Sequence, residues 1–415
     1  MQAQQQQAQR QRQAERLEQA ARRALVLPPA LMTKPTATAW KQASGKMAGY
    51  PLFDGTHLAF MLKEPRLLRG LEVADGKERW TVALPEKLAL EPLFAGDRLL
   101  YVTRELELVM LDPETGAVAK KLALDPLDTY TFSSKSNHAR ALFPAVEGDR
   151  LILATYGKGA GEPTGWITAV DLSTGTVAWK TAFPGGPDLT PQVKGDRVFV
   201  GGSGRVEALG LADGKLIWKQ HVGGAEEVTD GVLLDSTLTV LCGGRHHALD
   251  LAKGEVRWNV KHKGRPLFQG AGDRILTSEF RGAFIPSEWM VALDAATGKP
   301  AWELKVDGNR MPWISEGRVL CNSDENVMAL DLATGKPQWT KTLKERPALP
   351  FTLFGETLYV LSQDRKQARL QALKVADGSE AWGADCPRVQ GEGMILLSPE
   401  GFILADDDQR LFLLK

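Results

Sequence analysis

Cysteines, a histidine pair and a run of aspartates are the residues of this chain with the most chemical potential. Cys242, Cys321 and Cys386 lie far apart, and no CxxC pair occurs. This spacing excludes a disulfide framework and a cysteine-rich zinc site. No nucleophile elbow, P-loop or zinc-protease motif is found in the sequence. The sequence therefore offers no ready-made set of catalytic residues.

Three further motifs could bind ligands, but their spacing favours a structural interpretation. His246 and His247 are adjacent on an expected strand, so their side chains point to opposite faces and cannot share a metal ion. The three aspartates at 406–408 are expected at a hairpin tip, where a Ca²⁺ site would need further oxygen ligands. The glycine-rich segment 157–165 precedes no helix and is not a phosphate cradle. We therefore predict no catalytic, cofactor or metal-binding residues.

The charge balance excludes other classes of partner. The chain has 415 residues, with 51 Lys and Arg against 51 Asp and Glu, so its formal net charge is zero. Binding to nucleic acid or an anionic membrane is usually accompanied by a cationic excess. No run approaches the roughly 18 apolar residues of a membrane span. We expect no nucleic-acid partner and no transmembrane segment.

The first 35 residues differ in composition from the rest. Residues 1–23 are rich in Gln, Ala and Arg, and they offer little apolar surface for burial. The apolar stretch that follows is interrupted by Pro28 and Pro29, which makes it a poor signal-peptide core. We predict that residues 1–35 form a helical or disordered tail, with docking of that tail on a partner as the alternative.

A repeated ten-residue motif dominates the remainder, residues 36–415. It occurs eight times, as LEVADGKERW (71–80), LDPETGAVAK (111–120), VDLSTGTVAW (170–179), LGLADGKLIW (209–218), LDLAKGEVRW (249–258), LDAATGKPAW (293–302), LDLATGKPQW (330–339) and LKVADGSEAW (373–382). The turn glycines recur with a period of about 40 residues, which is typical of the blades of a β-propeller. Each copy contains a strand, a tight glycine turn and a second strand, which carries Trp in seven of the eight copies.

The two ends of the chain predict how the ring closes. Residues 400–415 align without gaps to residues 316–331, so the last repeat lacks its Trp-bearing strand. The segment around Trp40 can supply that strand, and pairing of the two ends would remove an exposed sheet edge. We predict an all-β chain folded as one closed propeller of four-stranded blades. Eight blades are favoured, although a literal count gives eight turns and one composite unit, so nine stay open.

The motif copies resemble the PQQ-like, or quinoprotein-type, repeat. That family includes quinoprotein alcohol and glucose dehydrogenases and the non-catalytic propeller lipoprotein of the outer-membrane barrel assembly machinery, to which the resemblance is nearest. The resemblance covers residues from about 40 to 415 and is specific for the fold. The dehydrogenases hold their quinone with adjacent cysteines and a Ca²⁺ ion, and no cysteine pair is adjacent in this chain. The resemblance therefore implies no cofactor for this chain.

The resemblance also implies that the motif tryptophans dock neighbouring blades. The residues in this position are Trp80, Trp179, Trp218, Trp258, Trp302, Trp339 and Trp382, with Trp40 as a further candidate. Lys120 stands where the second copy should carry Trp, so we expect the contact between blades to be weaker there.

Departures from the repeat indicate where partners bind. The hairpins within 148–171, 272–294 and 355–374 are lengthened, as is the connection between 120 and 148. Because strands alternate in direction, all of these insertions emerge on one face. That face is expected to carry aromatic and arginine side chains that could bind a protein, namely Tyr130, Phe132, His138, Trp166, Arg205, Arg245, Trp289, Arg369 and Arg410. The alternative is that the rings pack their own loops and the arginines pair with local carboxylates.

These observations favour a non-catalytic propeller that acts as a scaffold for protein partners, with a place in bacterial envelope or complex assembly. The alternatives are a quinoprotein-like dehydrogenase and a small-ligand sensor, both of which would use the central funnel. The family resemblance implies the periplasm or cell envelope. The absence of a signal peptide or lipobox in this sequence leaves a cytoplasmic location as the alternative.

Overall fold

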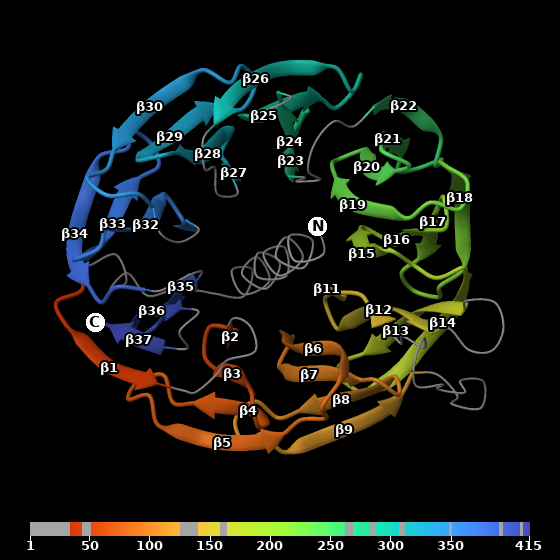
Figure 1. The fold of residues 1–415 in the computed structure, drawn as a ribbon. Coiled ribbons are helices and arrows are strands. Elements are labelled where there is room, and N and C mark those ends of the chain that lie inside the picture. Colours follow the sequence, from red (N-terminus) through yellow and green to blue (C-terminus); the bar gives the residue numbers. More distant parts are fainter. Residues whose placement is uncertain are drawn as a thin grey trace.

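The computed structural model describes residues 34–43, 51–124, 140–157, 164–261, 269–282, 287–306, 312–347, 351–389, 393–406 and 410–415. Within these ranges the chain is all β, and its strands form nine separate sheets arranged in a ring (Figure 1). We number the sheets as blades 1 to 9 in chain order. Almost all of the predicted tail 1–35 lies outside the described residues, so that boundary stays a prediction.

The first three blades contain the following strands, from the innermost to the outermost. Blade 1 consists of β2 (Leu52–Phe53), β3 (Leu58–Lys63), β4 (Arg66–Leu71) and β5 (Glu78–Ala83). Blade 2 consists of β6 (Leu88–Ala95), β7 (Arg98–Thr103), β8 (Glu107–Leu111) and β9 (Val118–Ala123). Blade 3 consists of β10 (Arg140–Ala141) and β11 (Ala145–Glu147), which both pair with β12 (Arg150–Gly157), then β13 (Thr164–Asp171) and β14 (Thr176–Pro184).

The next three blades follow the same order. Blade 4 consists of β15 (Leu189–Lys194), β16 (Arg197–Gly202), β17 (Arg205–Gly210) and β18 (Leu216–His221). Blade 5 consists of β19 (Val228–Leu233), β20 (Thr237–Cys242), β21 (Arg245–Asp250) and β22 (Val256–Lys261). Blade 6 consists of β23 (Gln269–Ala271), β24 (Arg274–Arg281), β25 (Ser287–Asp294) and β26 (Pro300–Val306).

The last three blades complete the ring. Blade 7 consists of β27 (Trp313–Ser315), β28 (Arg318–Ser323), β29 (Asn326–Asp331) and β30 (Pro337–Thr342). Blade 8 consists of β31 (Thr352–Phe354), β32 (Thr357–Gln363), β33 (Ala368–Lys374) and β34 (Glu380–Cys386). Blade 9 consists of β35 (Gly393–Ser398), β36 (Gly401–Asp406), β37 (Arg410–Leu414) and β1 (Thr38–Ala43).

The preference for eight blades is wrong, and the structure has nine. The eight motif turns each belong to a complete blade, and the composite unit at the chain ends forms a ninth sheet of its own. In that sheet β1 pairs antiparallel with β37, with Lys41 opposite Phe412, as the alignment of the chain ends led us to expect. The first strand therefore fills the outer position that the last repeat lacks. Its pairing covers the edge of β37 that would otherwise be exposed.

The apolar core is divided among the contacts between adjacent blades, which we call seams. Among the described residues, nine clusters of buried side chains are present, one for each seam. In the cluster between blades 3 and 4, for example, Ile152 and Ile167 of blade 3 pack against Val198 and Leu209 of blade 4. Alternation along each strand places successive residues in the two flanking seams, so every blade contributes to two clusters.

In most of these seams, a motif tryptophan of one blade binds the next blade. The indole Nε1 donates a hydrogen bond to a carbonyl three residues before the turn glycine of the next blade, at 2.8–3.0 Å, in the pairs Trp40–Val73, Trp80–Pro113, Trp179–Leu211, Trp218–Leu251, Trp258–Ala295, Trp302–Leu332 and Trp339–Val375. The ring also covers the glycine: a Cβ on Gly116 would lie 2.7 Å from Trp80 Cδ2, which leaves no room for another residue. The hydrogen bond and the ring contact together explain why Trp and Gly recur with the same period.

Two seams depart from this lock. Trp382 faces blade 9, whose outer turn is split between the chain ends, and its ring packs against Phe402 at 5.5 Å between centroids. Lys120 takes the place of Trp at the seam between blades 2 and 3, where a Cβ on Gly175 would lie 3.0 Å from Lys120 Cγ. Lysine thus covers the glycine with its aliphatic stem, but it lacks the indole ring.

Candidate functional site on the loop face

The antiparallel order of the strands separates two faces of the ring. The turns after the innermost strands and the motif turns lie on one face, which we call the turn face. The hairpins between the second and third strands lie on the other, the loop face, with the connections between blades. Strands β12, β13, β24 and β25 have eight residues each, whereas β16 and β17 have six. The lengthened hairpins therefore extend the loop face of blades 3 and 6.

Six of the candidate partner-binding residues occupy one register position on this face. Each lies within the first three residues of the third strand, where the chain re-enters the blade from the loop face. They are Trp166, Arg205, Arg245, Trp289, Arg369 and Arg410, in blades 3, 4, 5, 6, 8 and 9 respectively. The fold thus arranges them as a ring around the loop face and does not gather them into one patch. Tyr130, Phe132 and His138 lie outside the described residues.

The two tryptophans are partly buried, and a cation stacks on each ring. Lys180 Nζ lies 4.2 Å from the centroid of the Trp166 ring. The guanidinium of Arg281 lies 4.9 Å from the centroid of Trp289, whose Nε1 donates to Ser287 Oγ at 3.0 Å. Arg281 in turn binds Glu279 and Glu303. Such cation–π contacts restrict the orientation of both rings.

The four arginines are engaged within their own surroundings. Arg205 is buried, with 7% of its surface exposed, and pairs with Glu207 at 2.8 Å, so its guanidinium is not presented to solvent. Arg245 donates to Asn259 Oδ1 at 2.5 Å. A carboxylate accepts from each of the other two, at 3.0 Å for Arg369–Glu380 and 2.5 Å for Arg410–Asp406. The structure therefore favours local pairing of these arginines, although Arg245 stays exposed.

The other chemical motifs are structural in their placement. His246 and His247 are both buried, and burial lowers the pKa of His247. Asp406 is buried beneath Arg410, and the two aspartates after it lie outside the described residues. Burial raises the pKa of Cys321 and of Cys386 to about 12, so both thiols stay protonated. Among the described residues, no group of three or more His, Cys, Asp or Glu side chains could hold a metal ion.

Two residues that stabilise the seams were missed by the sequence analysis. Trp313 lies in the innermost strand of blade 7, and its Nε1 donates to the Phe351 carbonyl of blade 8 at 3.0 Å. Lys180 Nζ donates to the Leu124 carbonyl at the end of blade 2 at 2.5 Å, across the seam that lacks Trp. Neither residue belongs to the repeated motif. Only the isolated position of Trp313 outside the repeat could have drawn attention to it.

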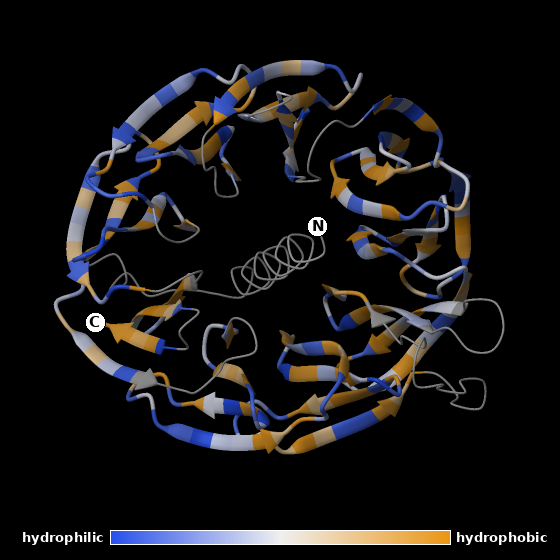
Figure 2. Cartoon of the chain, viewed as in Figure 1, coloured by the Kyte–Doolittle hydropathy of each residue, from blue (hydrophilic) through white to orange (hydrophobic). Residues whose placement is uncertain are grey.

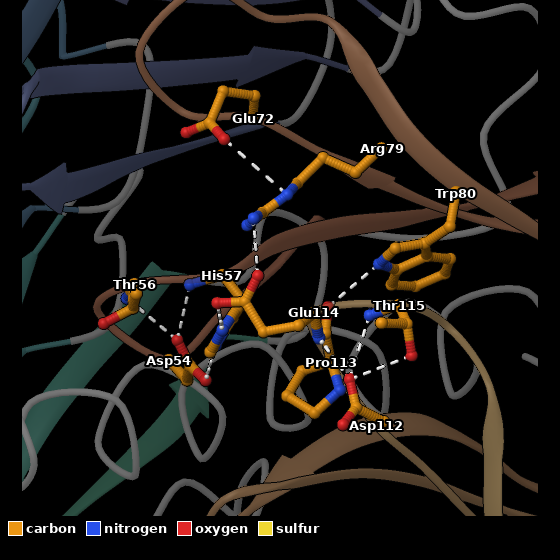
Figure 3. A network of polar contacts seen from close by, with 10 residues as sticks. All are labelled: Asp54, Thr56, His57, Glu72, Arg79, Trp80, Asp112, Pro113, Glu114 and Thr115. Atoms are coloured by element: carbon orange, nitrogen blue, oxygen red, sulfur yellow. Dashed lines mark hydrogen bonds and ion pairs between the residues drawn. The ribbon is translucent and has the colours of Figure 1, made fainter.

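A polar network on the turn face joins blades 1 and 2 (Figure 3). The imidazole of His57 lies between two carboxylates, with Nδ1 2.8 Å from Asp54 Oδ2 and Nε2 3.0 Å from Glu114 Oε1. Arg79 also reaches Glu114, at 2.5 Å. Burial lowers the pKa of His57, but the two carboxylates outweigh it, and the pKa is raised above 6.5. The network thus links His57 and Arg79 of blade 1 to the Glu114 carboxylate on the motif turn of blade 2.

The blade order, the tryptophan locks and the glycine turns define the class of protein, a β-propeller of PQQ-like repeats. A family model described as "Outer membrane protein assembly factor BamB" matches residues 30–162 and 243–395, which is more than half of the chain. The chain belongs to this family. No curated protein matches the chain by sequence.

Several solved structures are similar to this chain at low sequence identity. BamB from Moraxella catarrhalis is 20% identical, with 79% of this chain and 94% of that chain covered and a TM-score of 0.48. A quinohemoprotein alcohol dehydrogenase from Pseudomonas putida is 13% identical, covering 81% of this chain and 72% of that chain, also with a TM-score of 0.48. The computationally designed Ika8 protein is 12% identical over 78% of this chain and 95% of that one, with the same TM-score.

Proposed function

We propose that this chain is a non-catalytic β-propeller scaffold that binds protein partners on its loop face. One observation supports this most directly. Trp166 and Trp289 lie outside the set of docking tryptophans, and each is held by a stacked cation at the loop-face end of a lengthened hairpin. Large rings with restricted motion bind partners at a low cost in conformational entropy, and tryptophan is enriched among the residues that dominate binding energy.

The setting of this function is also a proposal. Membership of the assembly-factor family supports a role in building larger complexes, and it supports a periplasmic or envelope location for the chain. The described residues contain no apolar helix of the length needed to cross a bilayer. Within the ring, we expect Arg245 to contribute a partly free guanidinium to the same surface, because its acceptor is a neutral amide.

The experiment is affinity capture from the native host with the full chain as bait, read by mass spectrometry. The double variant Trp166→Ala with Trp289→Ala should lose most of the partner signal while its melting temperature changes little. The matched control removes two exposed lysines from the turn face of blades 4 and 7, Lys215→Ala with Lys336→Ala, and should capture partners like the wild type.

Three results would contradict the proposal. Retention of the partner by the tryptophan variant would remove the loop face from the function. A fall in stability as large as that of Trp218→Ala would show that the two rings are core residues. A thermal shift on addition of pyrroloquinoline quinone with Ca²⁺, accompanied by dye-linked alcohol oxidation, would replace the scaffold by a dehydrogenase.

A further inference from the structure

The exposed aliphatic side chains of this molecule gather on one part of its rim. Five large aliphatic residues are exposed among the described residues, with exposed fractions of 36–55%, namely Val118, Val177, Leu216, Ile217 and Val256. All five lie on the outermost strands of blades 2 to 5, within three residues of a motif glycine. These four strands, β9, β14, β18 and β22, follow one another along the rim in Figure 1, and Figure 2 shows hydrophobic residues interspersed along them. We call them the outer belt.

In four of the five blades outside the outer belt, the equivalent position carries a residue that protects a sheet edge, and in blade 9 it is Thr38. Two residues after the motif glycine, blades 1 and 8 have Glu78 and Glu380, and blades 6 and 7 have Pro300 and Pro337. Charged residues and proline on an edge strand discourage pairing with another strand. In blades 2 to 5 the same position is Val, Val, Leu and Val, so four consecutive blades have neither a charge nor proline at this position.

The backbone of the outer belt is also able to accept a further strand. Leu216 lies opposite Leu209 in blade 4, and Pro337 lies opposite Leu330 in blade 7, so the two positions have the same register. Because proline has no N–H, the ladder within a blade does not need a donor at this position. Since β18 is the outermost strand of blade 4 among the described residues, a further strand can be added at its outer edge.

The charge of the outer belt has one sign. Its four strands contain no Asp or Glu, and they carry Lys120, Lys121, Lys180, Lys219, Arg257 and Lys261. Lys121 and Lys219 contact acidic residues of the neighbouring strand only loosely, at 3.4 Å for Lys121–Glu107 and 3.7 Å for Lys219–Glu207. Arg257 pairs with Asp250 at 2.6 Å, and Lys180 is held by the Leu124 carbonyl and the Trp166 ring. The chain as a whole is neutral, so this is a local basic surface interrupted by aliphatic side chains.

We propose that the outer belt binds an extended segment of a partner protein in which carboxylates alternate with branched aliphatic residues. The segment adds as a strand to the open edges, its aliphatic side chains cover those of the belt, and its carboxylates meet the lysines. The rim is convex across the four blades (Figure 1), so a flat bilayer or a second ring could touch it only along a tangent. An extended chain can follow the curve. This surface meets the loop-face tryptophans only where Lys180 stacks on Trp166, and the proposal rests on the proposed function in that it shares the premise that the chain binds proteins.

The test uses the full chain and a defined probe. The probe is a fluorescent peptide in which Glu alternates with Val and Ile, and its binding is followed by anisotropy at low ionic strength. Two control peptides replace Glu by Lys or place Pro at the centre. We expect saturable binding of the probe alone, and the same affinity for the Trp289→Ala variant, whose ring contacts no belt cation in the described structure and so separates this surface from the loop face.

Two variants test the position of binding. Leu216→Pro copies the residue that blade 7 tolerates at the same register, and Ile217→Glu places an acid within the belt. Each should weaken probe binding by about tenfold or more, which corresponds to loss of one important contact. Gln338→Glu makes the equivalent change to Ile217→Glu on blade 7, outside the belt, and should bind like the wild type. Unchanged circular dichroism and melting temperature establish that the variants are folded.

The remaining outcomes overturn the proposal. Failure of the probe to bind, equal binding of the Lys peptide, or equal weakening by Gln338→Glu would each exclude a specific acidic segment on the belt. Binding to phosphatidylglycerol vesicles that Leu216→Pro and Ile217→Glu abolish would assign the belt to a lipid surface. Self-association in sedimentation that the same variants abolish would assign it to a second copy of the chain.

Discussion

The seam between blades 1 and 2 and the seam between blades 2 and 3 flank the same blade, but different chemistry holds them together. On the first, Trp80 covers Gly116 and donates to the Pro113 carbonyl, and His57 and Arg79 bind Glu114 on the same turn. On the second, lysine takes the place of Trp, and its aliphatic stem covers the turn glycine where the first seam has an aromatic ring. Both seams nevertheless contain a buried apolar cluster.

In the second seam, a side chain of blade 3 compensates for the tryptophan that blade 2 lacks. Lys180 of blade 3 reaches back to the Leu124 carbonyl of blade 2, and its ammonium group also stacks on Trp166. A buried leucine cluster, with Leu93 and Leu100 facing Leu151, supplies the remaining contact area. The comparison shows that the repeat specifies where a seam forms, while each seam can be stabilised by its own set of contacts.

The largest effect should come from removing the indole of the first seam. Trp80 is buried, and Trp80→Ala loses both its apolar contacts and the bond to Pro113, so we expect a loss of about 3–5 kcal/mol in the free energy of unfolding. Lys120→Ala is the matched change on the other side of blade 2 and should cost less than about 1 kcal/mol, because Lys120 is exposed. Denaturant unfolding measures both. Equal losses would show that lysine docks blade 3 as tightly as tryptophan docks blade 2.

The sequence predicted the features that are copied from blade to blade. The recurrent Trp and Gly identify the blades, and the alignment of the chain ends identifies β1 as the partner of β37. The predicted blade number is wrong because the composite unit at the chain ends forms a sheet of its own beside the eight complete repeats. The repeat also identified Lys120 as an exception, because a departure from a repeated motif is visible in the sequence alone.

The candidate site was less predictable because its contacts are particular to single blades. The pairing of Arg205 with Glu207 and the contact of Lys180 with Leu124 depend on which side chains alternation brings into the same seam. No repeated pattern records those contacts. Strand direction predicted which face carries Trp166 and Trp289. It did not predict the cations stacked on these rings, because Lys180 and Arg281 lie on other strands.

A smaller effect should follow from removing the compensating ammonium group of the second seam. Lys180→Met keeps the aliphatic stem and leaves the Leu124 carbonyl without this donor, so we expect a loss of about 1–3 kcal/mol. Lys219 follows the motif Trp of blade 4 as Lys180 follows that of blade 3, but it is exposed. Lys219→Met should therefore change stability by less than about 0.5 kcal/mol. Similar losses for the two variants would refute the compensation.

The smallest effect is the pH dependence of the first seam, which depends on His57. Its pKa is raised above 6.5 in the folded chain because the hydrogen bonds to Asp54 and Glu114 outweigh the cost of burial. A raised pKa means that the folded state binds the proton more tightly than the unfolded state. The stabilisation by His57 is therefore complete below pH 6.5 and is lost as the pH rises through the folded pKa.

Thermal melts of the wild type and of His57→Gln across this range isolate that contribution, since all other titrating groups are common to both. The stability advantage of the wild type should be largest in mildly acidic buffer and should shrink as the pH rises. Glu114→Gln removes the carboxylate that lies across the seam, so it should lower the pKa of His57 observed by NMR. An advantage that is constant or grows with pH would mean that His57 acts as a neutral hydrogen-bonding group, and that the two sides of blade 2 differ only in their aromatic lock.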